Sequence, residues 1–146
     1  MSTKPAKRSR KYFTPAEANA ALPLVQAIVR DIADLAQDLR ERQERLHGLL
    51  KSERGALGEA YREELKPIQE ELERKKERLM ECAKELENLG VELKDPNTGL
   101  VDFPAMMDGH EVYLCWRLGE SKVAFWHEIE AGFAGRQKLI LKPQTN

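Results

Sequence analysis

Two apolar stripes of helical period constrain the fold of this chain more than any other feature of its sequence. In each stripe the apolar residues step by three and four, which places them on one face of a helix and favours interdigitated packing against a second helix. The first stripe consists of Val25, Ile28, Ile32, Leu35, Leu39, Leu46 and Leu49. The second consists of Tyr61, Leu65, Ile68, Leu72, Leu79, Cys82, Leu86 and Leu89. Arg42 and Lys75 interrupt them, and their aliphatic stems are expected to lie over the seam.

The segment between the stripes favours a hairpin over one continuous rod. Gly55 and Gly58 weaken the helix there and permit a turn, which we place near Arg54. Antiparallel arms then bring apolar positions opposite one another along the whole seam, while charged side chains cover the outer faces. A two-helix hairpin buries only one stripe per arm. We therefore expect a homodimer in which two hairpins form a four-helix bundle.

The beginning of the first arm carries a capping signature. In Thr14-Pro15-Ala16-Glu17 the threonine and the glutamate have the spacing of a capping box, and the proline suits the first helical position. Pro23 follows within two turns, so we expect a short separate helix over residues 15–21 before the long arm begins. For the same reason Pro67 predicts a kink or a new helix start in the second arm.

From Gly90 onward the helical period gives way to short stretches bounded by turn residues. The strongest turn signals are 95–99, with the sequence Asp-Pro-Asn-Thr-Gly, and Asp108-Gly109. We expect a break at Pro104. The strands expected are 91–94, 100–103, 111–117 and 122–127, with a possible edge strand at 139–141. The side chains expected to pack on the hairpin are Val112, Leu114, Trp116, Val123 and Phe125.

Together these patterns predict an α+β fold. We expect a long, coiled-coil-like antiparallel helical hairpin with a small three- to four-stranded antiparallel β-meander at its open end. Three parts follow: a basic flexible tail over 1–13, the hairpin over 14–89 and the sheet domain over 90–146.

Charge and cysteine content argue against several classes of protein. The 146 residues carry 24 basic and 25 acidic side chains, and a net charge of −1 disfavours a protein whose main task is to bind nucleic acid. No apolar run has membrane-spanning length, and the stretch 1–11 lacks the apolar core of a signal peptide. Cys82 and Cys115 form no disulfide framework. We therefore expect a cytoplasmic protein without membrane contacts.

The polar residues that merit attention as a site gather in the expected sheet. With Asp108-Gly109 and Gly119-Glu120 as turn centres, Asp102, Tyr113 and either Trp126 or His127 are expected to lie roughly abreast on neighbouring strands. If His127 is in register it shares a face with Asp102, whereas a slip of one residue moves it to the opposite face.

An acid, an imidazole and a thiol on one face are able to ligate a transition metal or to support acid–base chemistry. Asp102, Cys115 and His127 are such a set, with Cys115 two residues along from the other two. Their spacing matches no standard metal motif, because there is no Cys-x-x-Cys pair and no second histidine four residues after His127. The alternative is a histidine that is hydrogen-bonded between sheet and loop.

Further candidate residues each have a structural alternative. Cys115 as a nucleophile needs a neighbouring base, and between large apolar residues a cysteine is more often a small buried filler. Trp116 and Trp126 are able to stack on a ligand, although strand tryptophans more often form core. Arg136, in a glycine-rich loop, suits an anion. Its alternative is an ion pair with one of Asp102, Glu120 or Glu128.

The chain resembles a known family in several separate motifs. They are Tyr12-Phe13-Thr14, Glu17-Ala18-Asn19, Leu22-Pro23, Gly90-Val91, Lys94-Asp95, Gly99 to Ala105, Tyr113 to Glu120, Trp126-His127 and Gly132 to Arg136. These motifs are similar to those of the bacterial DUF2203 family, and Leu-Cys-Trp-Arg-Leu-Gly-Glu is the most specific. The resemblance implies a small bacterial cytosolic protein with a helical N-terminal part and no assigned activity. The positions it shares with the candidates are Asp102, Cys115, Trp116, Glu120, Trp126, His127 and Arg136.

Two functional hypotheses follow from the sequence. The first is an interaction or scaffold protein, whose hairpin dimerises and whose sheet domain recognises a protein partner. The second is a metal- or small-ligand-binding domain, or an enzyme, whose site uses the acid, thiol, imidazole and guanidinium groups of the sheet. Because no catalytic signature is present, we expect a binding protein rather than an enzyme.

Overall fold

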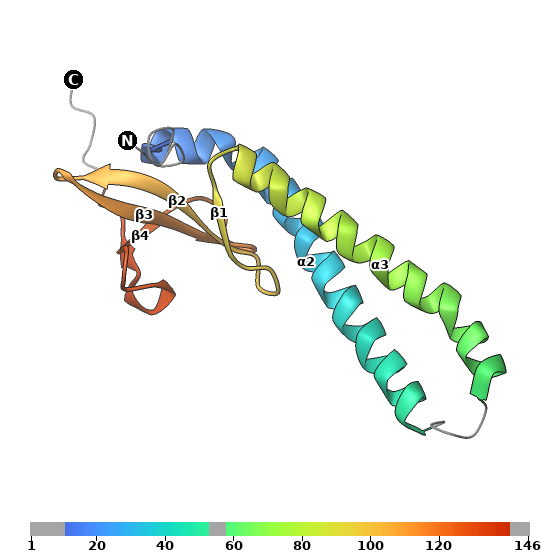
Figure 1. The fold of residues 1–146 in the computed structure, drawn as a ribbon. Helices are drawn as coiled ribbons and strands as arrows, with labels where there is room; N and C mark the ends of the chain where they lie inside the picture. Colours follow the sequence, from blue (N-terminus) through green and yellow to red (C-terminus); the bar gives the residue numbers. More distant parts are fainter. Residues whose placement is uncertain (1–10, 53–57, 141–146) are drawn as a thin grey trace, which may run out of the picture.

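The computed structural model describes residues 11–52 and 58–140 and has the expected α+β architecture (Figure 1). Two long helices, α2 (Pro15–Ser52) and α3 (Gly58–Asn88), run antiparallel. They are followed by β1 (Glu92–Asp95), β2 (Leu100–Met107), β3 (His110–Arg117), β4 (Phe125–Glu128), the 3-10 helix η1 (Phe133–Gly135) and β5 (Gln137–Lys138). The turn predicted near Arg54 lies outside the described residues.

Helix α2 begins as expected but does not divide at Pro23. The capping box is confirmed: the Thr14 amide donates to Glu17 Oε1 and the Glu17 amide to Thr14 Oγ1, both at 3.0 Å. The predicted separate helix over 15–21 is wrong, because one helix runs through Pro23. A proline inside a helix costs about 3 kcal/mol. Tertiary contacts offset this cost: Asn19 exchanges two hydrogen bonds with the backbone of Val123, at 2.8 and 3.2 Å. Helix α3 likewise continues through Pro67.

The sheet is an antiparallel meander of five strands in the order β1-β2-β3-β4-β5, one strand more than the largest number expected. The predicted break at Pro104 is wrong, since β2 runs through it. The carbonyl of Pro104 accepts the Phe13 amide at 2.7 Å, so this position is anchored on the chain that leads into α2. Among the described residues the last strand is Gln137–Lys138, and Leu139 and Ile140 of the expected edge strand lie outside it, while residue 141 is beyond the described part of the chain.

One hydrophobic core joins the helices to one face of the sheet. The sheet contributes Val101, Phe103, Ala105, Val112, Leu114 and Trp116, and the helices contribute Val25, Val29, Ile32 and Leu86, all of them buried. Phe125 was expected on this face and is not there. It pairs with Cys115, and residues paired across antiparallel strands share a face, so Phe125 lies on the side of the sheet away from the helices.

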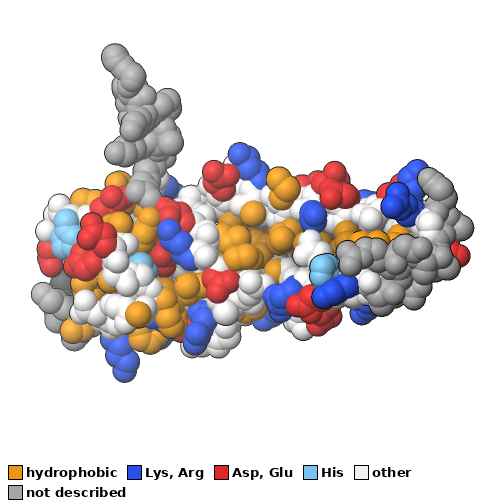
Figure 2. Space-filling model, turned by 60° about the horizontal axis from the view of Figure 1, so that its bottom comes forward, with side chains coloured by type: hydrophobic (Ala, Val, Ile, Leu, Met, Phe, Trp, Pro, Cys, Tyr) orange, Lys and Arg blue, Asp and Glu red, His pale blue; other side chains and the backbone are white. Residues whose placement is uncertain are grey.

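The β1–β2 turn attaches the sheet to α2. Gly99 has φ +72, and a Cβ at this position would lie 2.7 Å from the Leu118 side chain and 3.0 Å from Val29. Only glycine therefore permits this close approach. Further along α2, Arg40 donates to the side chain of Asn97 in the same turn. The helices continue beyond this contact as a projecting hairpin, along which Figure 2 shows a band of hydrophobic side chains between charged ones.

Among the described residues, neither helix carries an apolar stretch long enough to cross a membrane.

Candidate functional site

Three candidate side chains meet on the face of the sheet away from the helices. Asp102 on β2 pairs directly with Cys115 on β3, and Cys115 pairs with Phe125 on β4. His127 stands two residues after Phe125 and so shares its face. The expected register placed Tyr113 abreast of Asp102. The structure instead pairs Tyr113 with His127, and Asp102 with Cys115, because the two-residue turn at Asp108-Gly109 pairs Met107 with His110. The observed pairing differs from the expected one by two residues. Because strand side chains alternate between the two faces, Asp102, Cys115 and His127 still lie on one face.

The three functional groups are close together and buried. Nε2 of His127 lies 3.1 Å from each carboxylate oxygen of Asp102. One ligand atom from each of Asp102, Cys115 and His127 can be chosen so that all three lie within 4.8 Å of one another. His127 is 2% and Asp102 3% exposed, and Cys115 is fully buried. We call these three residues the buried cluster.

The second nitrogen of the imidazole ring fixes how protons are arranged in the buried cluster. Nδ1 of His127 lies 2.7 Å from the backbone carbonyl of Glu128. A carbonyl only accepts, so Nδ1 carries the proton of that bond. In a neutral ring Nε2 then has a lone pair, which would point at the carboxylate of Asp102. Two acceptors do not face each other at 3.1 Å without a cation, so either a second proton or a metal ion belongs between them.

Burial also sets the protonation of the other two groups. Desolvation raises the pKa of the Asp102 carboxyl, and the neighbouring His127 partly opposes that rise. Desolvation raises the pKa of the Cys115 thiol to about 12, and the negative charge of Asp102 adds to this effect. In the absence of a metal the thiol is therefore protonated at neutral pH. A bound cation favours the thiolate and carboxylate instead, because metal binding releases protons from its ligands.

Glu120 and Arg136 form a second polar group beside the buried cluster. Nη2 of Arg136 donates to Oε1 of Glu120 at 2.9 Å and forms an ion pair with Oε2 at 2.8 Å. The guanidinium carbon lies 3.9 Å from the ring centre of Phe125 and 4.6 Å from that of Phe133. Nε of Arg136 is buried without a hydrogen-bond partner. Arg136 was expected to pair with one of three acids, and the structure has the pair with Glu120. This ion pair joins the segment just before β5 to the turn that follows β3.

The tryptophans belong to the structural core rather than to the site. Trp116 is buried on the helix-facing side, and its Nε1 donates to the backbone carbonyl of Glu120 at 3.0 Å. Trp126 pairs with Leu114 and packs against the same core. Neither ring is on the face that carries the buried cluster. The alternating pattern of a strand separates Trp116 from Cys115 in this way.

Sequence reasoning missed one contributor to the site and left the contacts of another, Tyr113, unassigned. The carbonyl of Glu128 orients His127. A backbone acceptor of this kind cannot be predicted from the pattern of side chains. Tyr113 stacks at a tilt on His127 with ring centres 5.6 Å apart, and its hydroxyl donates to Glu92 at 2.8 Å. The alternation of 91–94 and of 111–117 would have placed Glu92 and Tyr113 on one face once the register was known.

The donor set of the buried cluster suits a divalent transition metal. It offers one nitrogen, one sulfur and one or two oxygens, which are the ligand types that Zn²⁺ takes in proteins. Ligand atoms around tetrahedral zinc lie about 3.3 to 3.8 Å apart, given bonds of about 2.0 to 2.3 Å. Nε2 of His127 and the Asp102 oxygens, at 3.1 Å, are close to that range, and all three ligand atoms lie within 4.8 Å of one another. Three protein ligands leave a fourth position for water or another ligand.

Comparison with known proteins identifies a family but no activity. No curated protein and no solved structure matches this chain. The family model described as "Uncharacterized conserved protein (DUF2203)" matches residues 11–139, a range that includes the buried cluster and both helices. The chain therefore belongs to the DUF2203 family.

Proposed function

We propose that this protein binds a divalent transition-metal ion, with zinc the best fit, through Asp102, Cys115 and His127. One observation carries the proposal: the three ligand atoms converge within 4.8 Å while the Glu128 carbonyl holds the far nitrogen of His127. A carbonyl on the second nitrogen is the usual support of a metal-bound histidine, because it fixes the tautomer and the ring orientation. The function proposed is binding, with no catalytic step.

The competing explanation is a buried ion pair. In that case a second proton on His127 satisfies Asp102, and the Cys115 thiol hydrogen-bonds to the same carboxylate. Both arrangements satisfy the contacts described above, so the measurement must separate a proton from a metal.

The first test is metal content by mass spectrometry of protein purified without an affinity tag or chelator. We expect close to one zinc per chain in the wild type and almost none in His127→Gln or Asp102→Asn. His110→Gln is the matched control. His110 also contacts a carboxylate, that of Glu128 at 3.1 Å, but it is exposed. A wild type without metal, whose melting temperature zinc does not raise, would leave the ion pair as the correct explanation.

Cobalt substitution tests the ligand set independently. Co²⁺ bound by a thiolate gives a sulfur-to-metal charge-transfer band and, in tetrahedral sites, visible absorption. We expect both in the wild type and the loss of the charge-transfer band in Cys115→Ser. A charge-transfer band that survives in Cys115→Ser would mean that the metal lies elsewhere, with Cys82 the other thiol of the chain.

A second candidate is the scaffold role expected from the sequence: a cytoplasmic bacterial protein whose coiled-coil-like hairpin joins partners. The projection of the hairpin beyond the contact of Arg40 with Asn97 favours it, since a metal site alone does not need helices of 38 and 31 residues. Deletion of the projecting part, with residues 42–71 replaced by a short turn, tests it. Retained metal with loss of a specific protein partner would support separate roles, whereas an unchanged set of partners would contradict the scaffold role.

A further inference from the structure

The hairpin has a hollow on the side away from the sheet. It measures about 400 Å³ and is lined by Asp31, Asp34, Leu35 and Asp38 of α2 and by Lys75 and Arg78 of α3. The sheet contacts α2 through Val29 and Arg40. These two residues stand two positions from Asp31 and Asp38 respectively, which is about 200° around the helix. The hollow is therefore not covered by the sheet.

The same face continues towards the tip of the hairpin. Steps of seven residues keep a helix position on one side, so Leu49 follows Arg42 on α2 and Ile68 precedes Lys75 on α3. Leu49 and Ile68 are each 38% exposed, although both belong to the apolar stripes. Leu35 is half-buried. The face thus combines a hollow with apolar residues that the two-helix hairpin leaves partly uncovered.

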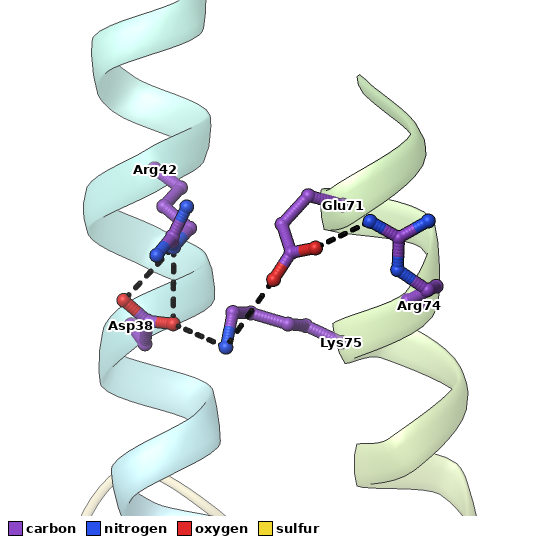
Figure 3. Close-up of polar contacts among 5 residues, drawn as sticks. All are labelled: Asp38, Arg42, Glu71, Arg74 and Lys75. Carbon is purple, nitrogen blue, oxygen red and sulfur yellow. Dashed lines mark hydrogen bonds and ion pairs between the residues drawn. The ribbon is translucent and has the colours of Figure 1, made fainter. Parts of the chain in front are cut away.

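The prevailing charge on this face changes sign along each helix, in opposite order on α2 and α3, although Glu41, Arg74 and Glu85 depart from the pattern. Lys75 lies level with Asp38, because Nζ is 3.1 Å from Oδ2, and Figure 3 shows it crossing between the helices. At this level and towards the sheet, α2 carries acids at 31, 34 and 38, and α3 carries bases at 75 and 78. Towards the tip, α2 carries bases at 42 and 45 beside an acid at 41, and α3 carries acids at 64 and 71 beside a base at 74.

We infer that this face binds a second copy of the chain, with a two-fold axis running along the hairpin. That axis places α2 of each copy over α3 of the other at the same level, and every neighbouring pair of helices is then antiparallel. Acids meet bases both near the hollow and near the tip, and Leu35, Leu49 and Ile68 are covered. An isologous interface requires one patch to be complementary to itself, and the opposite charge order supplies that complementarity. The result is a four-helix bundle with both sheets at the same end on its outside.

A charge-reversal experiment tests this interface, with the dimer dissociation constant measured by sedimentation equilibrium. Asp34→Lys and Arg78→Glu each change one side of the proposed contact, and neither residue takes part in any ion pair between described residues. We expect each variant to weaken the dimer about tenfold or more. The double variant restores it to within about threefold, because the reversed charges meet again across the two-fold axis. Added salt weakens the wild-type dimer.

Lys76→Glu is the matched control. Lys76 is an exposed base on α3 that lies about 200° around the helix from Arg78, and we expect no change in dimerisation. Ile68→Glu tests the apolar part and should also weaken the dimer at least about tenfold. Far-ultraviolet circular dichroism confirms that each variant is folded. A wild-type monomer at tens of micromolar, a double variant no better than the single ones, or an equal effect of Lys76→Glu would overturn the inference. Metal content is measured separately and does not depend on this result.

Discussion

The chain carries two acid–base contacts of equal length in opposite surroundings. Nε2 of His127 lies 3.1 Å from Asp102 in the sheet, and Nζ of Lys75 lies 3.1 Å from Asp38 between the helices (Figure 3). The first pair of side chains is 2% and 4% exposed, and the second 25% and 36%. The pKa of Asp102 is raised by desolvation. The pKa of Asp38 is lowered, mainly by its hydrogen bond to Lys75.

The difference shows that burial, rather than contact distance, decides what an ion pair does. In the hairpin, water remains available to both charges, so the pair tolerates the loss of a partner and specifies little beyond alignment. In the sheet, each group depends on the others because no water replaces a lost partner. A buried group of this kind costs stability unless it is satisfied. The cluster therefore suits a bound cation, and the hairpin layer suits recognition at a surface.

The largest expected effect is on the buried side of the comparison. In protein freed of metal by chelation, His127→Ala should destabilise by about 3–5 kcal/mol, because it leaves the Asp102 carboxyl buried without its partner. Urea denaturation followed by circular dichroism measures this. Lys75→Ala is the matched change in the hairpin and should shift the midpoint far less. Equal shifts would mean that burial does not separate the two pairs.

Alkaline pH should weaken the fold through Cys115. Its pKa is about 12 in the folded protein, against an ordinary value of 9.0. The unfolded thiol therefore ionises first, and the stability present below pH 9.0 is lost as the pH rises from there towards 12. At one unit above the ordinary pKa the loss is roughly 1.4 kcal/mol. It is measured as the pH dependence of the difference between wild type and Cys115→Ala, without metal. A pH-independent difference would contradict the burial of the thiol.

As the pH is lowered, Asp38 and Asp102 should change the stability of the fold in opposite directions. The lowered pKa of Asp38 gives stability that is present above its ordinary pKa of 3.8 and lost as the pH falls. The raised pKa of Asp102 works in the opposite direction: its contribution is full at low pH and is lost as the pH rises above 3.8. As the pH falls from about 5 to about 3, the free energy of unfolding of the wild type relative to Asp38→Asn should decrease. Relative to Asp102→Asn it should increase. High salt should reduce only the Asp38 effect.

The smallest expected effect concerns an exposed ion pair on α3. Arg74 contacts Glu71, and its side chain is 65% exposed. Arg74→Ala should leave the denaturation midpoint within experimental scatter, since an exposed pair loses as much side-chain entropy as it gains in attraction. A clear loss of stability in the monomer would mean that an exposed pair contributes as the buried His127–Asp102 pair does, which would contradict the role given to burial.

Much of the fold and part of the site could be predicted from local pattern. The helical period of the two stripes, the capping box at Thr14 and the turn at Asp108-Gly109 are local signals, and each is present in the structure. The candidate residues Asp102, Cys115 and His127 were singled out because an acid, a thiol and an imidazole on one face are able to ligate a metal. Their convergence needed a register that side-chain alternation alone leaves open by one residue.

What the sequence determined by itself is therefore the set of elements and the chemistry that they carry, because propensity, capping and turn geometry act over a few residues. Only the tertiary structure decided that α2 continues through Pro23, that β2 continues through Pro104 and that Cys115 faces Asp102. Each of these outcomes depends on partners far along the chain: the backbone of Val123, the amide of Phe13 and the pairing of three strands. Long-range contacts offset the local free-energy cost of a proline inside a helix or strand, and these contacts cannot be read from the local sequence pattern.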